Sequence, residues 1–123
     1  MNKPLRYLWI DDHRSPYTRD ELVAMKINPN GIFYVCRTLQ ACVRLMKSLP
    51  QTDQAFDRYF LDHDLGPYED VMMFLHWYKK KGFPTIDPST VTILSANPPG
   101  AKNIQAFLNS AWKTHELIHQ PLT

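Results

Sequence analysis

Acidic and hydroxyl-bearing residues are grouped at three places in this chain, each directly after a short apolar run. The groups are Asp11-Asp12, Asp62-His63-Asp64 and Ser95-Ala96-Asn97. Carboxylates within several ångströms of one another repel, so they either raise one another's pKa or recruit a cation. Oxygen ligands without cysteine favour Mg²⁺ or Mn²⁺, and a Mg²⁺ ion held by few carboxylates keeps positions open for a phosphate oxygen. If the three groups meet, the sequence predicts a metal-dependent phosphate site.

The segments that precede these groups have the pattern of buried strands. Apolar runs cover residues 5–10, 58–61 and 91–94, and each run stops at one of the polar groups. Residues 32–36 form another apolar run between turn-forming segments, and 116–119 is a candidate for a short final strand. Runs that are apolar along most of their length are typical of strands covered on both faces.

Helical patterns alternate with these strands. Thr18 and Glu21 form a capping-box pattern that opens a short helix, and Thr38 can cap a second helix with one apolar face. The segment 69–81 is acidic at its start and basic at its end, as the helix dipole prefers. Because this third helix is apolar on almost every side, we expect it to offer a surface for a protein partner as well.

A fourth helix is expected after a break at Pro98-Pro99-Gly100. Short strands that alternate with helices predict an α/β fold, a three-layer sandwich built on a doubly wound parallel sheet. In such sheets the ligand site lies beyond the carboxyl ends of the strands. The three polar groups should therefore converge on one edge of the sheet.

Composition limits the classes of protein that are possible. The chain has 123 residues, enough for one domain over 1–123, and its formal net charge of +2 does not by itself indicate a nucleic-acid or membrane surface. No signal sequence or membrane span is evident, so we expect a cytoplasmic protein without a membrane partner. Cys36 and Cys42 lack metal-site spacing and are expected to be buried thiols.

The strand-end residues resemble those of the receiver domain of response regulators. Receivers carry an acid pair after strand one, a phosphoacceptor aspartate after strand three and a Ser/Thr-Ala pair after strand four, which match Asp11-Asp12, Asp62 and Ser95-Ala96. The resemblance implies a flavodoxin-like, receiver-like fold. Receivers also have Lys-Pro after strand five, where this chain has Gln120-Pro121, and the sequence stops at Thr123. We therefore expect a truncated C-terminus that lacks the last helix.

The longer motifs are similar to those of a receiver-like family named for cyclic-phosphate processing. Its members carry DDxR, DHDLG and SxN, which match residues 11–14, 62–66 and 95–97. This resemblance implies a phosphoesterase-type protein that acts on, or recognises, a cyclic phosphate of a nucleotide or RNA end.

Each residue of the motifs then has an expected role. The metal, Mg²⁺ or Mn²⁺, would be held by Asp11, Asp12 and Asp62. The catalytic candidates are Asp62, His63, Asp64 and Ser95, and the substrate-binding candidates are Arg14 and Asn97. His63 or Asp64 would move a proton during in-line attack by water or by Asp62 itself.

Other interpretations of the same residues remain open. The chain could be a stand-alone atypical receiver that accepts phosphate on Asp62, although the missing lysine argues against this, or a non-catalytic binder of a nucleotide signal. Asp11-Asp12 and Ser95-Ala96-Asn97 are also ordinary turn sequences, and His63 could be a solvated loop residue. Three further histidines have no spacing that indicates a site; they are His13, His115 and His119.

Overall fold

The computed structural model describes residues 3–112, which are built around a four-stranded sheet in the order β2-β1-β3-β4. The strands are β1 (Arg6–Ile10), β2 (Ile32–Cys36), β3 (Arg58–Leu61) and β4 (Val91–Ile93). All three pairings are parallel, and Ile10 lies opposite both Cys36 and Leu61, while Leu61 lies opposite Ile93. The carboxyl ends of the strands are therefore aligned at one edge.

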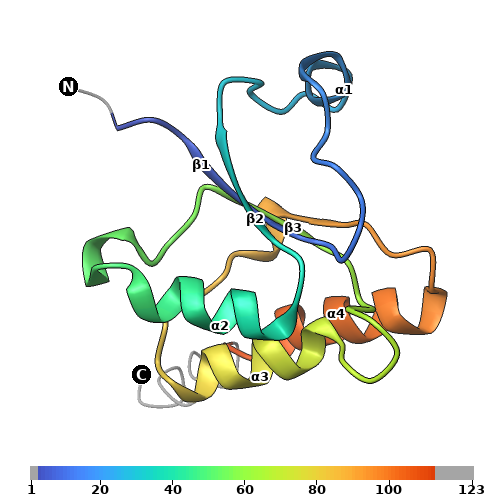
Figure 1. Cartoon of the computed structure of the whole chain (residues 1–123). Coiled ribbons are helices and arrows are strands. Elements are labelled where there is room, and N and C mark those ends of the chain that lie inside the picture. Colours follow the sequence, from blue (N-terminus) through green and yellow to red (C-terminus); the bar gives the residue numbers. More distant parts are fainter. Residues whose placement is uncertain (1–2, 113–123) are drawn as a thin grey trace, which may run out of the picture.

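Four helices complete the three layers that the sequence predicts. They are α1 (Arg19–Ala24), α2 (Leu39–Ser48), α3 (Val71–Lys80) and α4 (Pro98–Ser110), with short 3₁₀ turns at Gln51–Asp53 and Pro88–Thr90. Figure 1 shows α2, α3 and α4 together on one side of the sheet and the short α1 on the other. The receiver-like α/β fold is thus confirmed over the described residues.

The helices begin where side chains can satisfy their first backbone amides. Thr18 Oγ1 accepts a hydrogen bond from Glu21 N at 3.2 Å, and Glu21 Oε1 accepts one from Thr18 N at 2.9 Å, so both halves of the predicted capping box form. Thr38 caps α2 in the same way through Ala41 N. Asp70 caps α3 through Met73 N and therefore precedes that helix.

The prediction of a break at Pro98-Pro99-Gly100 is wrong. These residues form the first turn of α4, and Asn97 is its cap, with Asn97 Oδ1 accepting a hydrogen bond from Gly100 N at 3.2 Å. Proline is compatible with the first turn of a helix because the missing N–H has no intrahelical partner there. Two prolines in succession therefore mark the start of this helix.

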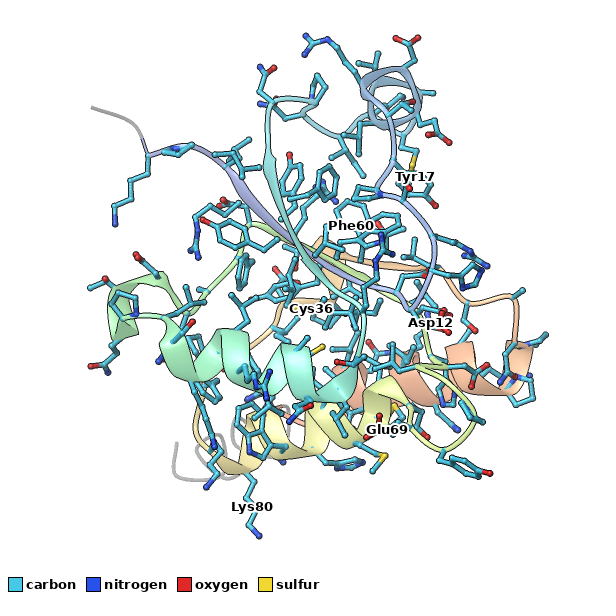
Figure 2. The ribbon with its side chains drawn as sticks, in the orientation of Figure 1. Asp12, Tyr17, Cys36, Phe60, Glu69 and Lys80 are labelled. Carbon is cyan, nitrogen blue, oxygen red and sulfur yellow. The ribbon has the colours of Figure 1, made fainter. Side chains whose placement is uncertain are left out.

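The sheet has a different core on each face. Along β1, side chains alternate, so Leu8 and Ile10 pack toward α2, α3 and α4, whereas Tyr7 and Trp9 pack toward α1. Because α1 is only six residues long, aromatic rings fill much of the second face. The rings of Trp9 and Phe60 have centroids 5.3 Å apart. Figure 2 shows Phe60 and Tyr17 on this side of the molecule.

Most apolar residues of α3 are used in the core, including Val71, Phe74, Leu75 and Tyr78. Met73 is the large apolar side chain of this helix that stays exposed, so a partner surface there remains a prediction.

Cys36 and Cys42 are buried free thiols, as expected. The candidate strand 116–119, Gln120-Pro121 and the expected lack of a last helix lie outside the described residues. In the part of the chain described, none of the helices combines the length and the apolarity needed to cross a bilayer.

Gly31 allows the ring of Tyr7 to lie against the backbone. A Cβ atom at this position would lie 2.1 Å from Tyr7 Cε2, and Tyr7 is buried, with its hydroxyl donating to Asn28 O at 2.6 Å. We predict that Gly31→Ala lowers the free energy of unfolding by about 1–3 kcal/mol, as overpacking does elsewhere, measured by urea denaturation. In a Tyr7→Leu background, Gly31→Ala should lower the free energy of unfolding much less. An equal cost in both backgrounds would mean that the ring is not the cause.

Candidate functional site

The sheet extends by one further hydrogen bond at each strand end, which brings the three polar groups together. Asp11 N donates to Cys36 O at 3.2 Å, Asp62 N to Ile10 O at 2.8 Å and Leu94 N to Leu61 O at 2.8 Å. A cavity of about 350 Å³ lies at this edge, near Asp12 in Figure 2. It is lined by Asp12, His13, Arg14, Asp62, Asp64, Ser95, Ala96 and Asn97.

Asp11 precedes the cavity residue Asp12; it is completely buried and is not among the residues that line the cavity. Its Oδ1 accepts hydrogen bonds from His13 N at 2.9 Å and from Arg14 N at 2.8 Å. Its Oδ2 is buried without a hydrogen-bond partner among the described residues, and the nearest cationic atom is Arg14 Nε at 3.8 Å. An unsatisfied buried carboxylate oxygen costs free energy, which a bound cation would offset. The donor set at this position therefore fits a metal ion.

Asp12 and His13 lie beside the carboxylate group of Asp11. One carboxylate oxygen each from Asp11 and Asp12 and a ring nitrogen of His13 lie within 4.8 Å of one another, so these three residues could hold a metal. His13 Nδ1 is 2.9 Å from Asp12 Oδ1 and 3.8 Å from Asp11 Oδ1. Asp62 is not part of this group.

Sequence reasoning missed His13. Its position directly after two acids was an available signal, but successive residues of an extended chain point in different directions. The chain turns after β1, and this turn brings the His13 ring close to the carboxylates of Asp11 and Asp12.

Asp62 follows β3 and is 7% exposed. Burial is the main reason that the pKa of Asp62 is raised, and the negative charge of Asp11 raises the pKa further, while Arg14 partly opposes both effects. Asp62 and Asp11 are thus close enough to repel each other. A cation between them would remove that repulsion.

Arg14 links two of the strand ends. Its Nη1 donates to Leu94 O, directly after β4, and its Nε lies near Asp11 Oδ2 after β1. The side chain is 40% exposed and lines the cavity, so the guanidinium is both anchored and accessible. The site therefore has a cationic group among its acids.

His63 and Asp64 form a pair next to the cavity; Asp64 lines it, whereas His63 is not among the lining residues. His63 Nδ1 lies 2.9 Å from Asp64 Oδ1, and the His63 side chain is only 12% exposed, so it is not a solvated loop residue. The hydrogen bond from His63 lowers the pKa of Asp64, with a smaller contribution from Asn97. Asp64, which lines the cavity, is therefore a stable carboxylate.

Ser95 and Asn97 have local structural roles in addition to lining the cavity. Ser95 Oγ accepts a hydrogen bond from Asn97 N at 3.0 Å, and Asn97 Oδ1 caps α4. Asn97 Nδ2 donates to Asp64 Oδ2 at 3.4 Å, which joins the loop after β4 to the loop after β3. Substrate binding by Asn97 and the catalytic role of Ser95 remain predictions.

The parallel sheet and the acidic cavity at its carboxyl edge define a receiver-type domain. The sequence matches the family model described as the cyclic-phosphate processing receiver domain over residues 6–110, a range that contains all four strands and every residue of the cavity. The chain belongs to this family. No curated protein and no solved structure gives a match.

We predict that Asp62→Asn raises the melting temperature of the metal-free protein by a few degrees at about pH 7, because it replaces a repelled, buried carboxylate with a neutral amide. A raised pKa in the folded state means that protonated Asp62 favours folding, and that this contribution is lost as the pH rises through the folded-state pKa. The difference between variant and wild type should therefore shrink toward about pH 4, the ordinary carboxyl range.

Glu69→Gln, which neutralises an exposed acid near the same edge, is the matched control for differential scanning fluorimetry and should change the melting temperature little. If Asp62→Asn melts at or below the wild-type temperature throughout this pH range, the buried charge of Asp62 is not a source of instability.

Gly100 in the first turn of α4 provides the surface on which His63 packs. A Cβ atom there would lie 2.5 Å from His63 Cγ and 2.9 Å from His63 Cβ. We predict that Gly100→Ala destabilises the wild-type protein, although alanine is normally better than glycine in a helix by about 1 kcal/mol. In a His63→Ala background the same change should be neutral or stabilising, as measured by urea denaturation. If Gly100→Ala lowers the free energy of unfolding in both backgrounds, contact with the His63 ring is not the cause.

Proposed function

We propose that this protein uses a metal-dependent phosphate site to act on, or recognise, a cyclic phosphate of a nucleotide or RNA end, with phosphoesterase-type chemistry. The family description supports the cyclic-phosphate part of the proposal. The observation that carries the site is the carboxylate group of Asp11, whose buried Oδ2 has no hydrogen bond among the described residues. Asp12 and His13 lie close to this carboxylate and line a cavity of mostly polar residues. This combination fits a cation that a phosphate can reach.

Asp11, Asp12 and Asp62 would hold the cation, and His13 is placed to contribute a ring nitrogen. Their oxygen-rich donor set favours Mg²⁺ or Mn²⁺. When bound, such an ion supplies Lewis-acid polarisation of a phosphate oxygen and neutralises charge that develops during phosphoryl transfer.

Arg14 and Ser95 would bind and orient the phosphate. A guanidinium group can donate two parallel hydrogen bonds to phosphate oxygens, and Arg14 already points along the cavity edge between Asp11 and Leu94. The hydroxyl group of Ser95 accepts from Asn97 N and keeps its own hydrogen for donation to a phosphate oxygen. Both contacts hold the phosphorus atom in a fixed place for in-line attack.

His63 would be the proton carrier. Opening a cyclic phosphate with water forms one P–O bond, breaks one P–O bond to the sugar and transfers one proton from the water to the leaving oxygen. Because hydrogen bonding keeps the pKa of Asp64 low, Asp64 is a poor proton acceptor near neutral pH. A histidine ring is suited to this task, and Asp64 Oδ1 would orient it and stabilise its protonated form.

A second function is favoured by the position of Asp62. This carboxylate directly follows β3, is nearly buried and shares the cavity with Ser95, as expected for a receiver that accepts phosphate. Here an oxygen of Asp62 would attack the phosphorus atom of a phosphodonor, the bond from phosphorus to the donor's leaving group would break, and Asp62 would keep the phosphoryl group as an acyl phosphate. The raised pKa of Asp62 is compatible with either function, because a bound cation would return it to the carboxylate form.

The test is incubation with 2′,3′-cyclic nucleotides, 3′,5′-cyclic nucleotides and an RNA oligonucleotide ending in a 2′,3′-cyclic phosphate, with and without Mg²⁺. Chromatography should show Mg²⁺-dependent conversion of a cyclic phosphate to a linear monoester. We expect His63→Ala to lower the rate by roughly 10²–10⁴-fold, the usual loss for a general acid–base group. Asp62→Asn should lose the response to Mg²⁺, and Glu69→Gln should retain full activity.

The other outcomes select the alternatives. Unaltered nucleotide recovered after tight, Mg²⁺-dependent binding would indicate a binder without turnover. A stable added phosphate mass after incubation with a small phosphodonor, absent in Asp62→Asn, would indicate the receiver function. If neither cyclic phosphates nor Mg²⁺ bind, the proposal is wrong.

A further inference from the structure

Arg37 lies outside the acid motifs, directly after β2 and half-buried. Its Nη1 donates to Asp11 O at 3.1 Å and also donates to Arg14 O. These two carbonyl groups belong to the first and last residues of the turn that carries Asp12 and His13. One side chain from the neighbouring strand thus holds both ends of the turn.

The turn determines where the carboxylate of Asp11 points. Asp11 Oδ1 is fixed by the amides of His13 and Arg14, and these amides converge on it only while the backbone is turned. With Oδ1 committed inside the turn, Oδ2 is the oxygen left without a hydrogen bond in the described structure. Loosening of the turn would release Oδ1 from these two amides and leave the carboxylate group of Asp11 free to rotate.

The end of β2 therefore holds Asp11 by both of its backbone polar groups. Cys36 O accepts the amide of Asp11 at 3.2 Å, and Arg37 binds its carbonyl group. Trp9 Nε1 adds a hydrogen bond to Arg14 O at 3.0 Å from beneath the turn. Since a guanidinium group has five N–H donors in a rigid fork, it is well suited to hold carbonyl groups at a set spacing.

We infer that Arg37 is a positioning residue that shapes the turn at Asp11–Arg14 for cation binding. The inference rests on the proposed function, because it assumes that this turn holds a metal. Arg37 is not among the residues that line the cavity. It acts through the backbone of Asp11 and Arg14, as residues that orient metal ligands from behind commonly do.

The experiment is a titration of ¹⁵N-labelled protein with Mg²⁺ alone, followed by the NMR shifts of the His13 and Arg14 amides, at a temperature well below melting. Arg37→Met keeps the apolar stem without donors, and Arg37→Lys keeps the charge on a shorter reach. We expect the Mg²⁺ dissociation constant to rise about ten-fold or more in Arg37→Met, the usual loss when an orienting partner is removed. In Arg37→Lys it should rise by less than in Arg37→Met but by more than about two-fold. The exposed Arg44 on α2 provides the control, and Arg44→Met should bind as wild type does.

Each result decides the inference. If Arg37 serves only the stability of the fold, the melting temperature falls while the Mg²⁺ dissociation constant of the folded variants stays within two-fold of wild type, and the inference is overturned. If Arg37→Met does not fold, the dissociation constant of Arg37→Lys decides by the same criterion. A wild-type protein that shows no Mg²⁺-dependent shifts removes the metal site, and with it both the proposed function and this inference.

Discussion

The site depends on the alignment of the strand ends in a parallel sheet. Ile10, Leu61 and Ile93 occupy one level of the sheet, so the residues that follow them leave it at the same edge. In an antiparallel sheet, alternate strands would carry their polar groups to opposite edges. The acids are therefore brought together by strand direction, and the hydrophobic faces of the same strands stabilise that arrangement.

This arrangement has an electrostatic cost. Asp11 is fully buried and Asp62 almost so, and the negative charge of Asp11 opposes the ionisation of Asp62. Arg14 offsets part of the repulsion from the solvent side, but Asp11 Oδ2 keeps no hydrogen bond in the described structure. A fold optimised for stability alone would not retain such a group at the end of a central strand, and unsatisfied groups of this kind concentrate at functional sites.

The scaffold around the site is rigid for reasons that are local and physical. Strand β1 is packed on both faces, so the turn at Asp11 begins from a fixed point. Asn97 caps α4 and also donates to Asp64, which couples the helix to the loop after β3. Gly100 leaves room for the ring of His63 at the start of α4. Residues outside the cavity thus hold residues that line it or lie next to it.

Periodicity and capping are local properties, so the four described strands, the capping box at Thr18 and the cap at Thr38 could be predicted from neighbouring residues. The start of α4 was predicted wrongly, because Pro98-Pro99-Gly100 suits a helix start as well as a break. The sequence also identified the polar groups at the strand ends. How those groups are arranged relative to one another depends on the folded chain. The turn after β1 buries an oxygen of Asp11 and brings His13 close to two carboxylates. Arg37 binds this turn from a segment distant in the chain. Neither a single turn nor a contact between distant segments leaves a periodic signal in the sequence.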